Sequence, residues 1–358
     1  VTLKLEAGSS GNLTGTNSIE AYEHYLKGMQ LWHERTAVSL EQSRIEFESA
    51  ILLDPAFAKA QAGLALYWTV VDGYILLDSS MTRKEALAAA ANTLKLDPAN
   101  VEAMTAEAGA LRYSRDFQQA DRLFKRVKQL NPSFATAYQW HGGLLGEMGD
   151  PLAGLASYQK AWSLDPLSRI IGYNLAYRLW ALGRVDEAVS AVAQVLEFAP
   201  EFPDGLDLMM MLNIAKGDCE SAETVAQRLA VALAKTNPDF GVYRAICQDR
   251  EPASRRQAFE TIMAWPEINF ADPDHPSLSY LPDVISLMIH AGILDLVWPL
   301  IETEGEDAAD TVAWLRTFRT DNGIRLQCSP RMKEFELKLN IPPAVDPVSY
   351  THLRAHET

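Results

Sequence analysis

The sequence has little cysteine and lacks the common motifs of catalysis and nucleotide binding. Only three of its 358 residues are cysteine, Cys219, Cys247 and Cys328, and no two of them form a Cys-x-x-Cys pair. An odd number of widely spaced cysteines disfavours a disulfide or metal framework, so we expect three separate, reduced side chains. No phosphate-binding loop, dinucleotide-binding glycine fingerprint, nucleophile elbow or His-Glu-x-x-His helix is present. The sequence therefore predicts no catalytic residues, no cofactor and no metal site.

Basic residues are outnumbered by acidic ones. The chain has 32 Lys and Arg against 47 Asp and Glu, a formal net charge of −15. Because an acidic surface repels phosphate groups and anionic lipids, we expect neither nucleic acid nor a membrane surface as a partner.

Long uninterrupted apolar runs are also missing. The longest one, residues 281–301, is broken by Asp283, His290, Asp295 and Pro299. A membrane-spanning helix needs about 20 consecutive, largely uncharged residues, so this run does not predict one. The sequence opens without Met and without the apolar core of a signal peptide, and we expect the chain to begin inside a larger protein.

What the sequence does contain is a period of 34 residues. Proline follows Leu-Asp, Leu-Asn, Leu-Asp and Phe-Ala at Pro98, Pro132, Pro166 and Pro200, each 34 residues after the last. A fixed period of this length is typical of stacked helix–turn–helix repeats. Proline disfavours helical geometry in the residue before it, so each proline is expected to end the second helix of a unit.

Two further sets of residues keep the same period. Glycine recurs at Gly149, Gly183 and Gly217, where the turn inside each unit favours a positive φ. Small residues also recur on the second helix, where they let the two helices approach closely: Ala120, Gly154, Ala188 and Ala222. The three registers together predict regular units at 101–134, 135–168 and 169–202.

The unit Ala135–Ser168 resembles the tetratricopeptide (TPR) repeat. It matches that pattern at five positions: Tyr138, Gly142, Tyr158, Ala161 and Pro166. At Gly154 it departs from the pattern, which usually has Ala. The resemblance covers roughly residues 18–240. It implies an all-α, right-handed superhelical solenoid of antiparallel helix pairs.

A finer resemblance lies near the two ends. The stretch Ala21–Gly28 and the stretch Cys328–Phe335 are similar to the first and last helices of a group of bacterial TPR regions. These regions follow a TolB-amino-terminal-like domain at the C-termini of multidomain signalling proteins. The proteins often begin with an adenylate cyclase or a winged-helix DNA-binding domain, neither of which is in this sequence.

The departures from the period predict the domain limits. Residues 1–17 are rich in Gly, Ser and Thr and indicate a linker or the end of an upstream domain. TPR-like repeats are expected over 18–240, and diverged helices forming a C-terminal cap over 241–345. Residues 346–358 fit nothing before them, and we hypothesise an unstructured tail that is not natural sequence.

Two acidic stretches contain residue types that bind metals. Asp272, Asp274 and His275 lie in a proline-rich loop, but no further ligand has a recognisable spacing, so a turn is the favoured role. The acidic run 302–310 lacks the ligand pattern of a calcium loop, and acidic residues are favourable at a helix N-terminus.

The resemblance also implies a binding surface. In TPR-like superhelices the first helices of successive units line a concave groove. Carried onto this register, the groove residues are Arg112, Tyr113, Gln139, Tyr173, Asn174, Tyr177, Trp180, Asp207 and Met211. Tyr173, Tyr177 and Trp180 share one helical face, and such aromatic side chains dominate binding hot spots. The alternative is that this stripe packs against a neighbouring helix.

The sequence thus predicts a non-catalytic scaffold that binds a protein or peptide. It is expected to be the partner-binding or sensory region of a larger bacterial signalling protein. The alternative is a regulatory or oligomerisation module of a nucleotide cyclase or a transcriptional regulator. With cysteines expected to be reduced, the cytoplasm is the expected location, or the periplasm if a membrane helix lies upstream.

Overall fold

The fold is described from a computed structural model of the chain. It describes residues 15–75, 77–232, 246–248, 252–263, 280–303, 308–339 and 341. These residues form helices and the turns between them, and none of them lies in a β-strand. The chain divides into two compact units, residues 1–114 and 115–358. The predicted all-α class is confirmed.

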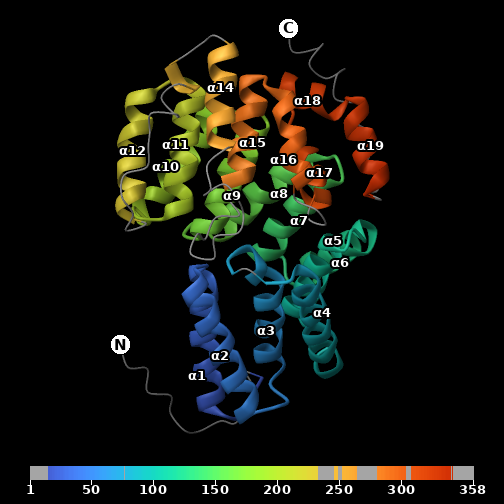
Figure 1. The fold of residues 1–358 in the computed structure, drawn as a ribbon. Helices are drawn as coiled ribbons and strands as arrows, with labels where there is room; N and C mark the ends of the chain where they lie inside the picture. The colour runs from blue at the N-terminus through green and yellow to red at the C-terminus, as the bar shows by residue number, and fades with distance from the viewer. Residues whose placement is uncertain are drawn as a thin grey trace. The chain divides into compact units, whose positions relative to one another are not determined.

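The first unit is built from helix pairs that follow one another along the chain. Its elements are α1 (Ile19–Glu34), α2 (Ala37–Leu53), α3 (Ala58–Val70), the short 3-10 helix η1 (Val71–Gly73), α4 (Ser79–Leu96) and α5 (Val101–Tyr113). Helix α1 packs on α2 and α3 on α4, and α5 contacts both α3 and α4 (Figure 1). Ser18 caps α1 by accepting the N–H of Ala21, as the sequence predicts.

One aromatic side chain fixes the spacing of the first three helices. Phe47 of α2 is fully buried, and its ring lies where Gly28 of α1 and Gly63 of α3 leave room. A Cβ at Gly28 would stand 2.6 Å from that ring, and one at Gly63 only 2.4 Å. Glycine at both positions therefore allows one phenyl ring to be shared by three helices.

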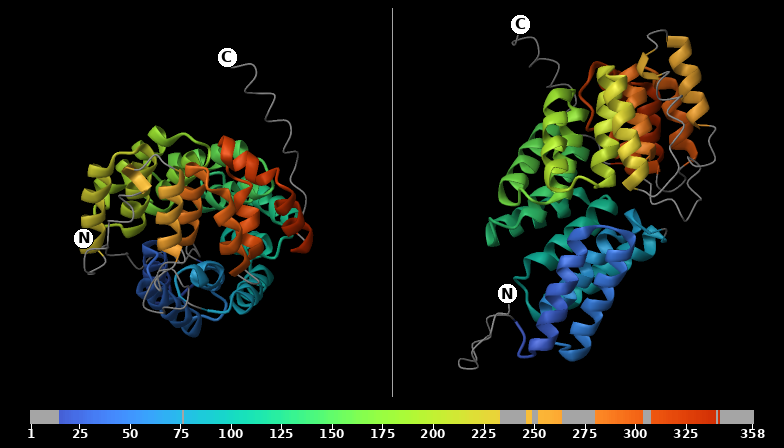
Figure 2. Two further views of the ribbon diagram at one scale, coloured as in Figure 1. Left: turned by 45° about the horizontal axis from the view of Figure 1, so that its top comes forward. Right: turned by 90° about the vertical axis from the view of Figure 1, so that its left-hand side faces the viewer.

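The second unit continues the pairs and then adds a group of C-terminal helices. The paired helices are α6 (Phe117–Leu130), α7 (Ala135–Glu147), α8 (Pro151–Leu164), α9 (Arg169–Ala181), α10 (Val185–Phe198), α11 (Pro203–Lys216) and α12 (Cys219–Ala232). After these come α14 (Pro252–Met263), α15 (Tyr280–Ala291), η3 (Leu294–Leu296), α16 (Val297–Thr303), α17 (Ala308–Leu315), α18 (Asp321–Gln327) and α19 (Pro330–Lys338). The predicted TPR-like solenoid of antiparallel helix pairs is confirmed, and Figure 2 shows the pairs from two further sides.

The Asp-Pro and Asn-Pro pairs end the second helices, as the period predicts. Helices α2, α4, α6 and α8 each stop one residue before such an Asp or Asn. The side-chain oxygens of Asp54, Asp97 and Asn131 then accept the N–H two residues further on, at 3.0, 3.1 and 3.1 Å. This local turn gives the chain its reversal before the next helix begins.

The turns inside the units take the backbone conformation expected of glycine. Gly149, Gly183 and Gly217 have φ values of +93°, +76° and +79°. Arg115 stands 34 residues before Gly149 and has a φ of +63°, so an arginine adopts the left-handed conformation at the first of these turns. The period of 34 is therefore a period of backbone geometry as well as of sequence.

Close helix contact in the unit 135–168 explains its departure from the TPR pattern. A Cβ at Gly154 of α8 would lie 2.7 Å from the carbonyl oxygen of Gly142 in α7. That oxygen belongs to the backbone and cannot move aside cheaply, so Ala does not fit there. In the neighbouring units Ala120, Ala188 and Ala222 occupy the equivalent positions and are fully buried.

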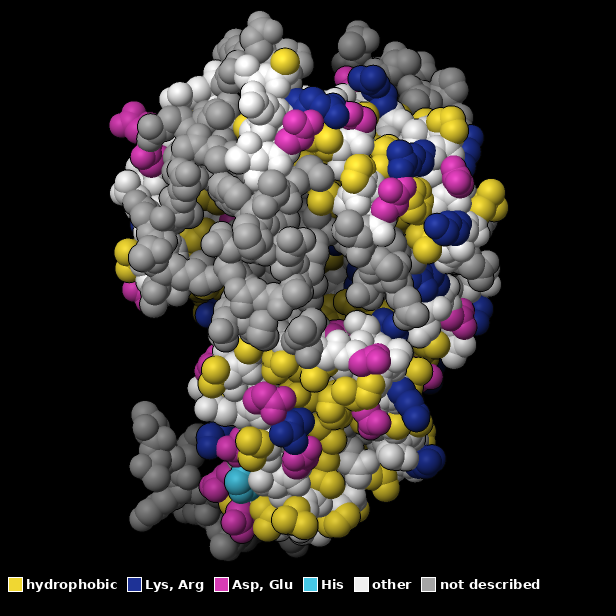
Figure 3. All heavy atoms as spheres, viewed as in Figure 1, with side chains coloured by type: hydrophobic (Ala, Val, Ile, Leu, Met, Phe, Trp, Pro, Cys, Tyr) yellow, Lys and Arg dark blue, Asp and Glu magenta, His cyan; other side chains and the backbone are white. Residues whose placement is uncertain are grey.

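Several predictions of domain limits fall outside the described residues. These are most of the linker 1–17, the repeat end at 240, the loop with Asp272, Asp274 and His275, and the tail 346–358. Within the described part of the chain, no helix combines the length and the apolar character that crossing a membrane requires. Acidic and basic side chains are interspersed on the face shown in Figure 3.

Candidate binding site

The candidate site is a face of the second unit formed by α7, α9 and α11, the first helices of three successive pairs. The residues predicted for the groove in this unit lie on these helices, and we call this set the inner face: Gln139, Tyr173, Asn174, Tyr177, Trp180, Asp207 and Met211. Helix α15 packs against α11, and α17 packs against α7. Figures 1 and 2 show these orange helices beside the green repeat helices. Later helices of the same chain therefore cover the inner face.

The centre of this contact is a pairing of α9 with α15. Tyr177 and Trp180 are 6% and 0% exposed. The Tyr177 hydroxyl and the Ser286 hydroxyl are 2.8 Å apart and share a hydrogen bond. One turn further along α15, the His290 ring stacks on the Trp180 indole with 5.1 Å between ring centroids. The two residues of α15 are four apart and the two of α9 are three apart, so one face of each helix meets the other.

The protonation of His290 follows from this packing. Its Nδ1 lies 2.8 Å from the carbonyl oxygen of Ser286, so Nδ1–H donates a hydrogen bond within α15. Burial lowers the pKa of His290, and hydrogen bonds to the backbone of Ser286 and Trp180 oppose this shift only partly. The ring that stacks on the indole is therefore neutral at pH 7.

Two arginines hold the segment between α17 and α18 against the ends of the repeat helices. Arg316, which is 2% exposed, donates from Nη1 to the carbonyl of Glu147 at 3.2 Å. Arg319 donates from Nη2 to the carbonyl of Gly149 at 2.9 Å and from its backbone N–H to Ala181 at 3.0 Å. Cations are favourable at helix C-termini, where carbonyl groups have no partner within the helix. The segment thus satisfies the last turns of both α7 and α9.

The remaining aromatic and amide residues of the prediction contact their own surroundings. The half-buried Tyr173 ring lies 6.1 Å from that of Tyr177 and 6.2 Å from that of Phe202. Asn174 donates from its side chain to the carbonyl of Ile170, one turn earlier in the same helix, at 2.8 Å. These contacts are within the repeat helices and the loop before α11.

Arg112 and Tyr113 belong to the first unit, on α5. The Arg112 guanidinium lies over the ring of its neighbour Tyr113, 5.2 Å from the centroid. Whether any of the nine predicted residues binds a partner stays a prediction. In the structure, the inner-face residues of α9 meet α15 and α17 of their own chain.

A buried acidic corner lies at the start of α11. Gln139, Asp207 and Met211 are all less than 9% exposed. Burial raises the pKa of Asp204 to about 6; the nearby Asp207 carboxylate adds to this rise and Arg169 opposes it. Among the residues that the structure describes, no group of three or more His, Cys, Asp and Glu side chains is placed to hold a metal ion.

Sequence reasoning missed the residues that cover the inner face. Ser286, His290, Trp314, Arg316 and Arg319 come after the 34-residue period has ended, so no register assigns them a face. The Trp314 ring, for example, lies 6.2 Å from that of Tyr177. Only the alternative interpretation of the aromatic stripe, packing against another helix, pointed towards this arrangement, and it named no helix.

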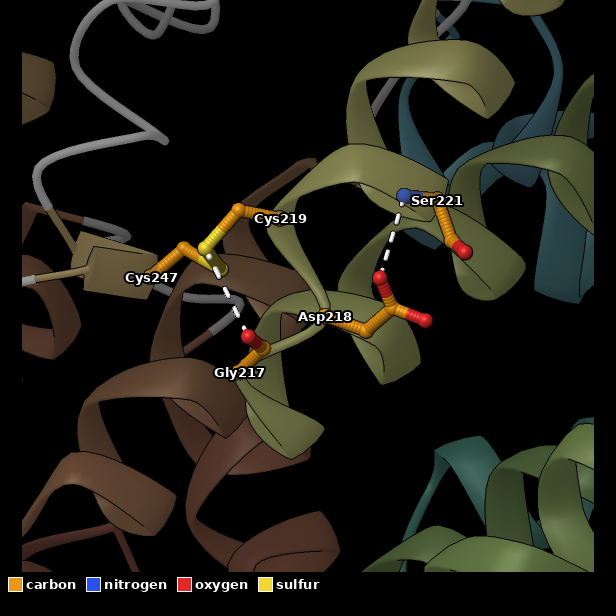
Figure 4. The surroundings of a disulfide bond; sticks show 5 residues. All are labelled: Gly217, Asp218, Cys219, Ser221 and Cys247. Carbon is orange, nitrogen blue, oxygen red and sulfur yellow. Dashed lines mark hydrogen bonds between the residues drawn. A yellow bond between two sulfur atoms is a disulfide. The ribbon is translucent and has the colours of Figure 1, made fainter.

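The structure corrects the expectation of three reduced cysteines. Cys219 and Cys247 form a disulfide bond, with their Cα atoms 5.8 Å apart, as Figure 4 shows. Gly217 ends α11 in the left-handed conformation, and Asp218 caps α12 by accepting the N–H of Ser221 at 3.1 Å. This tight turn places Cys219 at the first position of α12.

The partner cysteine lies in the short helical stretch 246–248 and is buried. The two cysteines are 28 residues apart, a separation that matches no disulfide or metal motif, so their pairing left no signal in the sequence. Cys328 is free and exposed, as expected.

The sequence matches no protein-family model and no curated protein. Solved structures with a similar arrangement include pilF of Pseudomonas aeruginosa, with 17% identity, 61% of this chain and 93% of that chain covered, and a TM-score of 0.42. A thermophilic TPR protein of Thermus thermophilus has 21% identity, covers 54% and 96%, and has a TM-score of 0.43. YrrB, described as a TPR protein with an unusual peptide-binding site, has 20% identity, covers 55% and 95%, and has a TM-score of 0.36. These similarities carry no inference about function, which rests on this chain's own residues.

Acid should loosen the contact between α9 and α15. In the unfolded chain His290 has a pKa of about 6.5, and in the folded chain burial lowers it. Below about pH 6.5 the unfolded state therefore binds more protons, and stability falls with pH. We expect the wild type to lose more free energy of unfolding than His290→Phe between pH 7.5 and pH 5, measured by urea denaturation.

The comparison isolates His290 because other groups are common to both proteins. His141, whose pKa burial lowers to about 4, acts in the same direction as His290. Asp204, whose pKa is raised to about 6, acts in the opposite direction, since protonating it favours the folded state. Equal losses in the two proteins would contradict a buried, neutral His290.

Removing the disulfide should destabilise the second unit. Cys219→Ser and Cys247→Ser each open a 28-residue loop, and we expect either to lower the free energy of unfolding by about 2–4 kcal/mol. Cys328→Ser, at the exposed free cysteine, should change it by less than about 0.5 kcal/mol. Denaturation with and without a dithiol reductant measures this. A wild type whose stability does not respond to the reductant would show that the bond does not form.

Proposed function

We propose that this chain is a non-catalytic scaffold for protein–protein interaction, and that its inner face binds an amphipathic helix. One observation carries this proposal: the inner face already holds α15 through side-chain contacts specific to two helices. Ser286 and His290 meet Tyr177 and Trp180, and the flanking residues Ile285 and Met288 are fully buried. Recognition of a helix by an apolar surface is a recurring mode of peptide binding.

The chemistry of the inner face defines the helix it would accept. Tyr177 offers one hydroxyl at the centre of an apolar surface, and Trp180 offers a flat indole one turn further along α9. A fitting helix carries a small polar residue and, four positions later, a flat ring, with apolar residues beside them. The aromatic anchors are held by their own unit before binding, which reduces the entropy lost when a helix docks.

Because α15 occupies this face, an outside helix has to compete with it. The apparent affinity of the competitor is its intrinsic affinity multiplied by the fraction of molecules in which the face is open. Any change that weakens α15 therefore increases partner binding, without altering a residue of the inner face itself. The scaffold is in this sense regulated by its own C-terminal helices.

The wider setting remains part of the proposal. The resemblance of Ala21–Gly28 and Cys328–Phe335 to bacterial TPR regions supports a partner-binding or sensory role within a signalling protein. The same resemblance supports the alternative, a regulatory or oligomerisation module of a nucleotide cyclase or transcriptional regulator. The gene sequence upstream of Val1 discriminates between them. The net charge of −15 supports a protein partner over nucleic acid.

The disulfide changes the proposed location. Disulfides persist in oxidising compartments and are rare in the cytoplasm. The Cys219–Cys247 bond therefore supports the periplasmic alternative, whereas the cytoplasmic expectation depended on reduced cysteines.

The proposal is tested with a fluorescently labelled peptide of residues 280–291, the sequence of α15, added to the full chain. Met288→Asp places a charge at a fully buried position of α15 and should expel that helix from the inner face. We expect the labelled peptide to bind Met288→Asp at least tenfold more tightly than the wild type, measured by fluorescence anisotropy.

The matched control is Leu337→Asp, the same kind of change at a position that is 84% exposed on α19. It should bind the peptide no better than the wild type. If Met288→Asp loses helical circular dichroism, the milder pair Ser286→Ala and His290→Ala replaces it. Peptide binding that does not increase when α15 is weakened would refute the proposal.

A further inference from the structure

The outer face of α2, in the first unit, carries an apolar stripe that no described residue covers. Val38, Ile45 and Leu52 follow one another at intervals of seven residues and are 68%, 52% and 84% exposed. Seven residues are about two helical turns, so the three side chains lie in one line. The opposite face of the same helix holds Leu40 and Phe47, both fully buried. Helix α2 is therefore apolar on two sides.

This concentration of exposed apolar residues is specific to α2. Together with Leu53, α2 has four large hydrophobic residues that are more than a third exposed. The other described helices have one or two such residues each, or none. Single exposed hydrophobic residues are normal on protein surfaces, whereas contiguous ones mark interaction sites. The regular spacing adds that the missing partner is itself a helix.

The charges beside the stripe determine what kind of helix fits. Glu41 and Glu48 flank Ile45 along one edge, with side chains 42% and 47% exposed. Arg44 contacts both, at 3.0 Å and 2.8 Å, so two carboxylates share one guanidinium and a net negative charge remains. In Figure 3, magenta and dark blue side chains lie among yellow ones on the face of the first unit that carries α2.

We propose that the outer face of α2 docks a basic amphipathic helix of another protein. Its apolar residues, repeating every seven positions, would cover Val38, Ile45 and Leu52, and its lysines or arginines would pair with Glu41 and Glu48. A second copy of this chain fits less well, because each copy carries a net charge of −15 and the same acidic edge. This surface lies in the first unit and does not depend on the function proposed for the inner face.

The expected complex is weak and reversible. A stable interface buries about 1,600 Å² in total, and one stripe of three side chains on a single helix provides much less. Exposed charges next to the stripe add an attraction that salt screens within about 10 Å at 0.1 M ionic strength. Dissociation constants in the micromolar range at low salt, rising with ionic strength, are expected from this combination.

Two synthetic helical peptides of about five turns test the proposal with the full-length protein. Both carry leucine at seven-residue intervals, and they differ only in having lysine or glutamate beside the leucines. We expect the lysine peptide to bind at least tenfold more tightly than the glutamate peptide. Ile45→Asp should weaken binding of the lysine peptide at least tenfold. Glu48→Lys, which reverses one charge of the edge, should weaken it less.

The choice of Ile45→Asp separates docking from general charge attraction. The substitution makes the chain more acidic, so attraction by charge alone would tighten the binding of a lysine peptide. Val231→Asp makes the same change in charge at a position 79% exposed on α12 and should leave binding as in the wild type. Ile45 is half exposed, so the variant should keep its fold, which circular dichroism verifies; Leu52→Asp, at 84% exposure, is the second variant.

Three results would overturn the proposal. One is equal binding of the lysine and glutamate peptides. The second is an undiminished affinity of Ile45→Asp and Leu52→Asp. The third is a concentration-dependent dimer of the wild type that Ile45→Asp abolishes, since that would assign the stripe to a second copy of this chain.

Discussion

The structure depends on one constraint: a helix pair of a solenoid cannot bury its apolar surface by itself. Each pair of the second unit packs against the next, but the first helices α7, α9 and α11 also present an inner face rich in aromatic side chains. Trp180, at 0% exposure, and Tyr177, at 6%, need cover from outside the repeats. Helix α15 supplies it, with Ser286 and His290 as its contacts. The second unit is therefore a repeat array whose inner face is closed by its own chain.

Much of the fold was predictable because its causes are local. Proline after Asp or Asn ends the second helices, and glycine at a positive φ forms the turn inside each unit, as at Gly183. These effects act within a few residues and leave a period of 34 in the sequence. Even the departure at Gly154 has a local cause, the carbonyl of Gly142 at 2.7 Å from where a Cβ would lie.

The site was predictable only in part. The period placed Tyr177 and Trp180 correctly on one face of α9, but it gave no information on what that face meets. The contacts of Arg316 with Glu147 and of Arg319 with Gly149 join positions about 170 residues apart in the chain. The Cys219–Cys247 bond likewise depends on a chain reversal, for which a single sequence holds no pattern. Long-range packing of this kind has to be seen in three dimensions.

Hydrogen–deuterium exchange of the full chain tests the central claim, that α15 rests on the inner face, most directly. The amides of residues 283–291 should exchange about as slowly as those of α9, because both helices are protected by the same contact. Exchange of α15 at the rate of an unstructured peptide, while α9 stays protected, would contradict the claim and leave the inner face open.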